Sequence, residues 1–209
     1  MSSALRRGRL ARAARALNAR TASGRLPPLI LMTDERRTPD PLKSALALPP
    51  GAAIILRHRN PNLRIELAHE LAKLGRQRGL SLLISDDAGL AARVQADGLH
   101  LPEAHARQAA HWRALHPFWL ITAAAHSARG ISVAAACRAD AAILAPVFPT
   151  LSHEDRASLG AVRFRLITLR STIPVYALGG VNTDTVGRLK DAPLAGIAGI
   201  EGLVGDQSA

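Results

Sequence analysis

The sequence has a single cysteine and very few aromatic residues. Cys137 is the only cysteine among 209 residues, and aromatic residues make up 3% of the chain. A lone cysteine cannot form an intrachain disulfide or a thiolate cluster for zinc or for iron and sulfur. No stretch approaches the ~20 uninterrupted apolar residues that a membrane-spanning helix needs. These absences exclude a disulfide scaffold and predict a cytoplasmic protein with no membrane partner.

Acidic residues are absent from the first 25 positions. This segment carries seven arginines, and it therefore contributes most of the net charge of +11 that the whole chain has. No aromatic residue accompanies these arginines, so the mixture of cations and stacking rings that binds single-stranded nucleic acid is missing. The composition therefore disfavours a nucleic-acid partner.

The rest of the chain has the pattern of an α/β protein. With 48% apolar residues, it can bury a full core. Eight short runs rich in Ile, Leu and Val alternate with segments of helical periodicity, as in βα units around a parallel sheet. The runs begin at Leu29, Ala52, Leu80, Ala96, Phe118, Ala141, Pro174 and Gly196. Eight repeats predict a closed (β/α)₈ TIM barrel. An open doubly wound sheet is the alternative, but Thr33, Asp34 and Glu35 stand where its glycine fingerprint would follow the first strand.

Apolar residues at helical spacing predict the faces that cover this barrel. One set is Leu63, Leu67, Leu71 and Leu74, and another is Val162, Leu166 and Leu169. The N-terminal segment has a further set, which is Leu10, Ala13, Ala14 and Leu17. We predict that residues 1–25 form a basic helical extension packed on a barrel of residues 26–205. The Arg-rich, acid-free composition also resembles an organellar transit peptide, but we prefer the packed helix.

Polar residues follow the predicted strands at their carboxyl ends, which in a barrel lie on one face and form the active site. Arg57 and Arg59 stand two apart after the second strand, so we expect both guanidinium groups to face one cavity and bind an anion. The alternative for these arginines is a structural ion pair with Asp34 or Asp86. His126 follows the fifth strand and is a candidate for proton transfer.

Two further strand ends suggest phosphate chemistry. A single carboxylate with substrate phosphates can hold Mg²⁺, and we assign that role to Asp86, while Asp87 is expected to cap the next helix. Gly179 and Gly180 end the seventh strand, where backbone N–H groups can approach a phosphate. The predicted partners are small phosphorylated molecules, and a homo-oligomer is left open.

Taken together, the strand endings resemble those of the thiamine phosphate synthase and thiazole tautomerase superfamily from Leu29 to Leu203. The matching segments are LMTD, ILRHR, ISDDAGLA, ADGLHL, AAAHS, APVFPT and ALGGV. The resemblance implies a barrel that joins a pyrimidine diphosphate to a thiazole phosphate and releases pyrophosphate with Mg²⁺. It places the diphosphate on Arg57, Arg59, Thr150 and Ser152, the metal on Asp86, and the thiazole phosphate on Gly179 and Gly180.

Several positions depart from the pattern of that family. Ser85 replaces the asparagine before the metal carboxylate, and His105 stands where a second metal acid is expected. Ala124 replaces a serine two residues before His126, and His153 replaces a lysine in the substrate pocket. Glu201 replaces a serine near the end of the eighth strand. Only six residues follow Leu203, which predicts a truncated or missing eighth helix.

Three functions are compatible with these residues. The leading hypothesis is a synthase-like transferase, which the paired arginines favour. The alternative within the superfamily is a thiazole tautomerase that uses His126 as general acid and base, which the loss of the second metal acid favours. The third is a non-catalytic barrel that binds a phosphorylated ligand, because a site can change while its fold persists.

Overall fold

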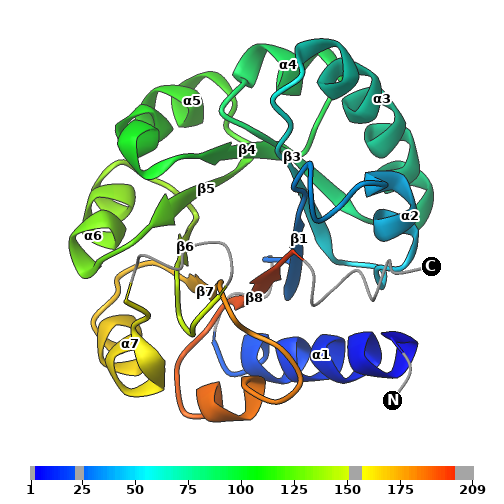
Figure 1. The fold of residues 1–209 in the computed structure, drawn as a ribbon. Helices are drawn as coiled ribbons and strands as arrows, with labels where there is room; N and C mark the ends of the chain where they lie inside the picture. The colour runs from blue at the N-terminus through cyan, green and yellow to red at the C-terminus, as the bar shows by residue number, and fades with distance from the viewer. Residues whose placement is uncertain (1–2, 22–25, 151–156, 201–209) are drawn as a thin grey trace.

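The computed structural model describes residues 3–21, 26–150 and 157–200. Eight parallel strands pair in chain order, and β8 pairs with β1 to close the barrel (Figure 1). The strands are β1 (Leu29–Met32), β2 (Ala53–Leu56), β3 (Ser81–Ser85), β4 (Gly98–Leu101), β5 (Leu120–Ala125), β6 (Ala141–Leu144), β7 (Val175–Ala177) and β8 (Gly196–Gly199). Each predicted apolar run contains one of them, so the predicted (β/α)₈ barrel is confirmed.

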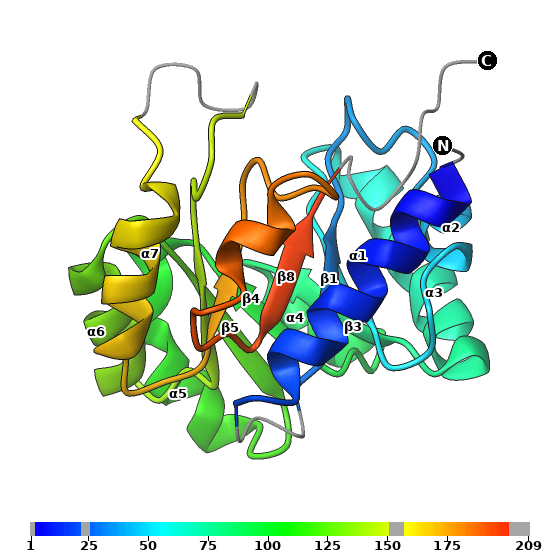
Figure 2. The same cartoon turned by 90° about the horizontal axis from the view of Figure 1, so that it is seen from below.

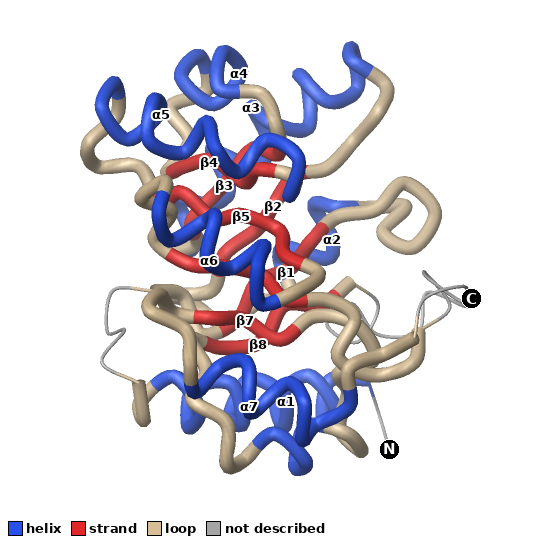
Figure 3. The backbone as a smooth tube through the Cα atoms, turned by 90° about the vertical axis from the view of Figure 1, so that its left-hand side faces the viewer, coloured by secondary structure: helices blue, strands red, loops and turns tan. Residues whose placement is uncertain are grey.

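Helices surround the strands as an outer layer, which is seen in Figure 3 as blue tubes around the red sheet. The α-helices are α1 (Ser3–Asn18), α2 (Pro41–Leu46), α3 (Pro61–Arg78), α4 (Ala88–Arg93), α5 (Ala109–Leu115), α6 (Ala128–Ala136) and α7 (Gly160–Leu169). Two 3₁₀ helices complete the layer, η1 (Glu103–Gln108) after β4 and η2 (Val186–Leu189) after β7. No described helix is long and apolar enough to cross a membrane.

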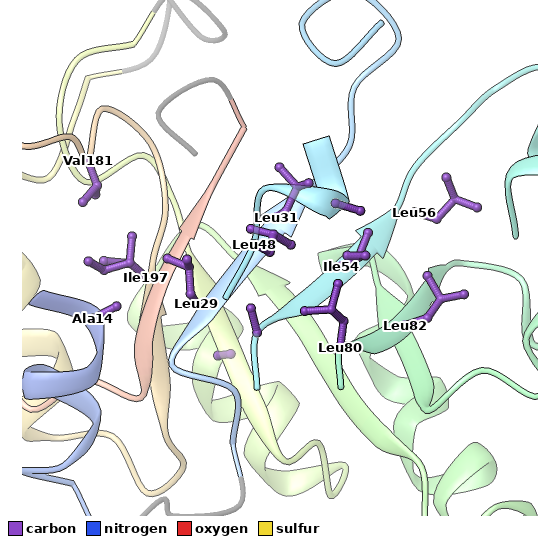
Figure 4. Packing of buried hydrophobic residues seen from close by; sticks show 14 of the residues in the cluster. Ala14, Leu29, Leu31, Leu48, Ile54, Leu56, Leu80, Leu82, Val181 and Ile197 are labelled. Carbon is purple, nitrogen blue, oxygen red and sulfur yellow. The ribbon is translucent and has the colours of Figure 1, made fainter. Parts of the chain in front are cut away.

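Alternation along the strands separates two hydrophobic layers. Residues such as Ile30, Ile55 and Ile143 fill the barrel interior together with Tyr176. The Tyr176 hydroxyl donates to the carbonyl oxygen of Pro27 at 2.7 Å, and this bond satisfies the polar atom of a buried ring. The side chains that point outward pack under the helices (Figure 4). The interior is therefore a packed core, and ligand space is left at its ends.

Helix α1 lies across β8 and β1 at the edge of the barrel (Figure 2). Leu10, Ala14 and Leu17 are buried, and Ala14 packs in the same cluster as Ile197 of β8 (Figure 4). Asn18 Nδ2 donates to the carbonyl oxygen of Ala195 at 2.6 Å, which fixes the end of the helix beside β8. The apolar stripe predicted in this segment thus packs on the barrel. In the described part of the chain no helix follows β8, and residues 201–209 lie outside that part.

The two apolar faces predicted for the helices after β2 and β6 differ in how far the structure confirms them. Leu67 and Leu71 of α3 are buried against the barrel, as predicted, and Leu74 is partly buried beside them, but Leu63 at the start of the helix is exposed. The prediction for α7 was wrong in its orientation, because Val162, Leu166 and Leu169 are all at least half exposed. Phe164 and Thr168 form the buried face of α7 instead. Apolar residues occur on all sides of this helix, so their spacing does not select the buried face.

Candidate active site

A cavity of about 190 Å³ opens at the carboxyl ends of the strands on one side of the barrel mouth. Its walls come from the segments that follow β1, β2, β6 and β7, and from the end of β8. We call it the glycine pocket. The lining residues are Arg37, Arg57, Ala145, Pro146, Thr150, Leu178, Gly179, Gly180, Val181, Asn182, Ala198, Gly199 and Ile200.

Two arginines of the glycine pocket share one carboxylate. Arg37 and Arg57 each place a terminal nitrogen near Asp34 Oδ2, at 3.0 and 3.2 Å. The hydrogen bond from the Arg37 side chain holds the pKa of Asp34 at about 2, so this carboxylate is ionised at neutral pH. Burial lowers the pKa of Arg57, and the negative charge of Asp34 raises it. An arginine remains charged at neutral pH under such opposing effects. Two cations and one anion leave the group with a charge of +1 on the pocket wall.

The glycine turn after β7 forms the opposite part of the lining. Gly179 and Gly180 have φ angles of +90° and +63°, which disfavour residues with a side chain. A Cβ on Gly180 would lie 2.5 Å from the carbonyl oxygen of Pro149, so this close approach requires glycine. Among the described residues, the N–H groups of Gly179 and Gly180 donate to no acceptor. These donors are available to an anion in the pocket.

The expectation that Arg57 and Arg59 face one cavity was wrong. Strand β2 ends at Leu56, so the alternation of side chains does not continue to Arg59. Arg59 is exposed and does not line the glycine pocket, and its backbone N–H donates to Glu35 Oε1. Arg57 points into the pocket and also forms the ion pair with Asp34 that was considered as the alternative.

The other side of the mouth is organised by the short helix η1, which follows β4 and contacts both β4 and β5. His105 Nδ1 lies 2.7 Å from Asp86 Oδ1, and the Glu103 side chain accepts the N–H of His126 at 3.2 Å. We call these four residues the η1 cluster. In the described residues no group of three or more His, Cys, Asp or Glu side chains could hold a metal ion. Asp86 is therefore a single carboxylate, and the side chain that it contacts is the imidazole of His105.

The residues around Asp86 are also bonded within the chain. Asp86 has a φ of +57°, a conformation that Asp tolerates better than most residues, and its N–H donates to the carbonyl oxygen of His100. Asp87 caps α4, because its side chain accepts the N–H of Leu90 at 2.8 Å, as predicted. Ser85 is half-buried at the end of β3, and its carbonyl oxygen accepts a hydrogen bond from Arg64.

His126 lies beside the glycine pocket without lining it. Its Nδ1 is 2.9 Å from the carbonyl oxygen of Ala145, which is itself a pocket residue. A carbonyl oxygen only accepts, so this contact requires a proton on Nδ1. In the neutral ring the proton acceptor is then Nε2.

His100 is buried inside the barrel mouth on β4. Its Nδ1 is 2.9 Å from the Thr122 hydroxyl, and the side chain is almost inaccessible. Burial, with a smaller contribution from the Arg57 charge, lowers the pKa of His100 to about 3. The ring is therefore neutral at pH 7, and it adds no positive charge beside Arg57.

The predicted site residues thus divide into three groups. Arg57, Thr150, Gly179 and Gly180 line the glycine pocket. Ser85, Asp86, His126 and Arg59 lie outside its lining. Ser152 and His153 lie outside the described residues, as does Glu201. Arg37 was missed by sequence reasoning, and the signal that could have revealed it is the pair of arginines soon after Asp34.

Comparisons with known proteins show one family for most of this chain. A family model described as thiamine monophosphate synthase matches residues 29–203. A putative thiamine-phosphate synthase 2 from Aquifex aeolicus is 31% identical over 180 residues, which cover 84% of this chain and 96% of that protein. A thiamine-phosphate synthase from Prochlorococcus marinus is 29% identical over 174 residues, covering 81% of this chain but only 50% of that longer protein. The solved thiamine phosphate pyrophosphorylase from Pyrococcus furiosus aligns with a TM-score of 0.75 at 28% identity, covering 88% of this chain and 90% of that chain.

Proposed function

The chain belongs to the thiamine monophosphate synthase family, and from that premise we propose that it is a transferase of the thiamine phosphate synthase type. It would couple a hydroxymethylpyrimidine diphosphate to a thiazole phosphate and release pyrophosphate. The observation that carries this proposal is the glycine pocket, where two guanidinium groups and two glycine N–H groups meet at the carboxyl ends of barrel strands. Such a pocket suits phosphorylated ligands.

The reaction consists of one bond exchange. A carbon–nitrogen bond forms between the thiazole nitrogen and the methylene carbon of the pyrimidine, and the carbon–oxygen bond to the diphosphate breaks. The bonding electrons leave with the pyrophosphate, whose negative charge grows as the bond breaks. Preorganised cations near the leaving oxygen stabilise that charge more than the charge of the bound substrate, and this difference accelerates the reaction.

Within this proposal, Arg57 and Arg37 bind the diphosphate with Thr150, and the N–H groups of Gly179 and Gly180 bind the thiazole phosphate. The lining of the pocket supports these roles. Because His100 is neutral, it places no positive charge in the interior that would compete with Arg57 for the diphosphate. Ser152, His153 and Ser85 stay predictions as substrate contacts, and Mg²⁺ on Asp86 stays a prediction as well. A cytoplasmic location is also proposed, because the substrates are small charged metabolites and the lone Cys137 suits a reducing compartment.

One observation favours the tautomerase as a second candidate. His126 is held against the pocket wall by its contact with the carbonyl oxygen of Ala145. An imidazole at that position could move a proton on a thiazole bound in the glycine pocket. Such an enzyme would need the thiazole phosphate alone and would release no pyrophosphate.

A turnover assay separates these functions. The protein is incubated with both substrates, and thiamine phosphate and pyrophosphate are quantified together by chromatography. Stoichiometric formation of the two products supports the synthase. Isomerisation of the thiazole substrate without pyrophosphate would replace the proposal by the tautomerase, and binding of both substrates without turnover would leave a binding protein.

A further inference from the structure

The η1 cluster places an imidazole where the resemblance to the family implies a second metal acid. His105 Nδ1 contacts Asp86 Oδ1 at 2.7 Å, which is hydrogen-bond distance. The backbone of Asp86 is fixed as well, by its N–H bond to the carbonyl oxygen of His100. The carboxylate that would bind a metal is therefore already oriented toward a partner within the chain.

A Mg²⁺ ion does not fit the donors that the described residues offer at this position. Mg²⁺ requires oxygen ligands in octahedral geometry, and a neutral imidazole is a poor ligand for it. The Asp87 carboxylate accepts the N–H of Leu90 and lies 3.8 Å from Arg64, while Glu103 accepts the N–H of His126. No described group of three or more His, Cys, Asp or Glu side chains gathers here or elsewhere. Each nearby carboxylate thus has a structural partner.

The positive charge that an anionic ligand needs is supplied on the other side of the mouth. Arg37 and Arg57 line the glycine pocket and outnumber the single carboxylate of Asp34. The glycine N–H groups add further donors without adding charge. These groups are fixed in the chain, so their net charge of +1 attracts a phosphate or diphosphate at any concentration of divalent cation.

We propose that His105 occupies the place of a metal ligand, and that the glycine pocket binds its phosphorylated ligand without a divalent cation. This inference rests on the proposed function for the identity of the ligand, but the role assigned to His105 does not depend on turnover. It also distinguishes this chain from what its family resemblance implies, because the family reaction includes Mg²⁺.

The first test is calorimetric titration of Mg²⁺ alone into the full chain. We expect no saturable binding at millimolar Mg²⁺ for the wild type. The variant His105→Asp restores a second carboxylate beside Asp86, and it should bind Mg²⁺ at least tenfold more tightly than the wild type. His111→Asp is the matched control, because it makes the same substitution at an exposed position on α5 and should not bind. Circular dichroism checks that each variant is folded.

Two outcomes of this titration would overturn the proposal. One is a saturable Mg²⁺ isotherm in the wild type that Asp86→Asn removes, because Asp86 would then bind the ion despite His105. The other is a folded His105→Asp variant that binds Mg²⁺ no better than the wild type, because His105 would then not be the group that excludes the ion.

The second test is titration of inorganic pyrophosphate, once with EDTA and once with saturating Mg²⁺. We expect dissociation constants within threefold of each other after correction for the Mg²⁺–pyrophosphate complex. A loss of tenfold or more in EDTA would contradict the metal-independent pocket. If pyrophosphate binds under neither condition, the proposed function and the metal-independent pocket both fail, while the Mg²⁺ titration still decides the role of His105.

Discussion

The two sides of the barrel mouth differ in how their polar groups are used. In the glycine pocket, Arg37 and Arg57 outnumber their shared carboxylate, and two glycine N–H groups have no acceptor among the described residues. In the η1 cluster, Asp86 is bonded to His105, and Glu103 is bonded to the backbone of His126. One side keeps donors available for an anion, and the other satisfies its charges internally. The glycine pocket is thus the side of the mouth that is suited to bind an anionic ligand.

The largest effect that we expect comes from removing both arginines of the glycine pocket. The double variant Arg37→Ala/Arg57→Ala should weaken pyrophosphate binding by about 10²- to 10⁴-fold, because each charge-assisted contact contributes roughly 1.5–3 kcal/mol. Calorimetric titration measures the loss. The double variant Arg36→Ala/Arg59→Ala removes the same charge from exposed positions and should change the affinity less than threefold. Equal losses in both double variants would show that only net charge matters.

A second prediction concerns His100, which is buried on β4 inside the barrel. Its pKa is about 3 in the folded chain and near 6.5 in the unfolded chain. Between these values the unfolded state binds the extra proton, so the free energy of unfolding falls as the pH is lowered. Lowering the pH from 7 to 4 should reduce the free energy of unfolding by about 3 kcal/mol through this residue. Chemical unfolding of the wild type and of His100→Asn at both pH values measures the difference, and equal pH dependence would refute the assignment.

The requirement for glycine in the pocket gives a third prediction. Gly180→Ala introduces a side chain at a positive φ and against the carbonyl oxygen of Pro149, so it should destabilise the fold by more than about 2 kcal/mol. Gly51→Ala is the matched control, because Gly51 has a φ of +79° but open space around its Cβ position. We expect Gly51→Ala to lower the free energy of unfolding by about 1 kcal/mol, as measured by urea unfolding. If the two variants lose the same stability, close packing does not require Gly180.

The smallest effect is expected for His126→Ala. If the chain is a synthase, the pocket cations carry the reaction and turnover should fall less than tenfold. Steady-state rates in the two-substrate assay measure this change, with pyrophosphate affinity as the control for binding. In an assay of thiazole isomerisation, by contrast, a loss of 10² to 10⁴ in rate with unchanged affinity is typical of a missing general acid or base, and it would favour the tautomerase.

Sequence reasoning located the strands and part of the candidate site for one physical reason. Buried parallel strands are short continuous apolar runs, and the residues that follow them are brought together by barrel closure, which placed Arg57, Thr150, Gly179 and Gly180 in one pocket. Arg59 was misplaced because β2 ends at Leu56, and the end of a strand depends on pairing with its neighbours.

The remaining features do not follow from the periodicity of apolar residues. Arg37 reaches the pocket from a loop, and its position is set by hydrogen bonds to Asp34. The pairing of His105 with Asp86 requires η1 to fold back toward β3. The buried face of α7 could not be chosen from the sequence, because that helix carries apolar residues on all of its sides.

The division of the mouth can be tested directly by nuclear magnetic resonance. Inorganic phosphate, which stands in for the phosphate group that the two glycine N–H groups bind in the proposed function, is titrated in EDTA into the ¹⁵N-labelled full chain, and each backbone N–H signal is followed. We predict that the signals of Gly179 and Gly180 shift and saturate together, while those of Asp86 and His105 stay unchanged. Saturable shifts at Asp86 and His105, with none at the two glycines, would contradict the account.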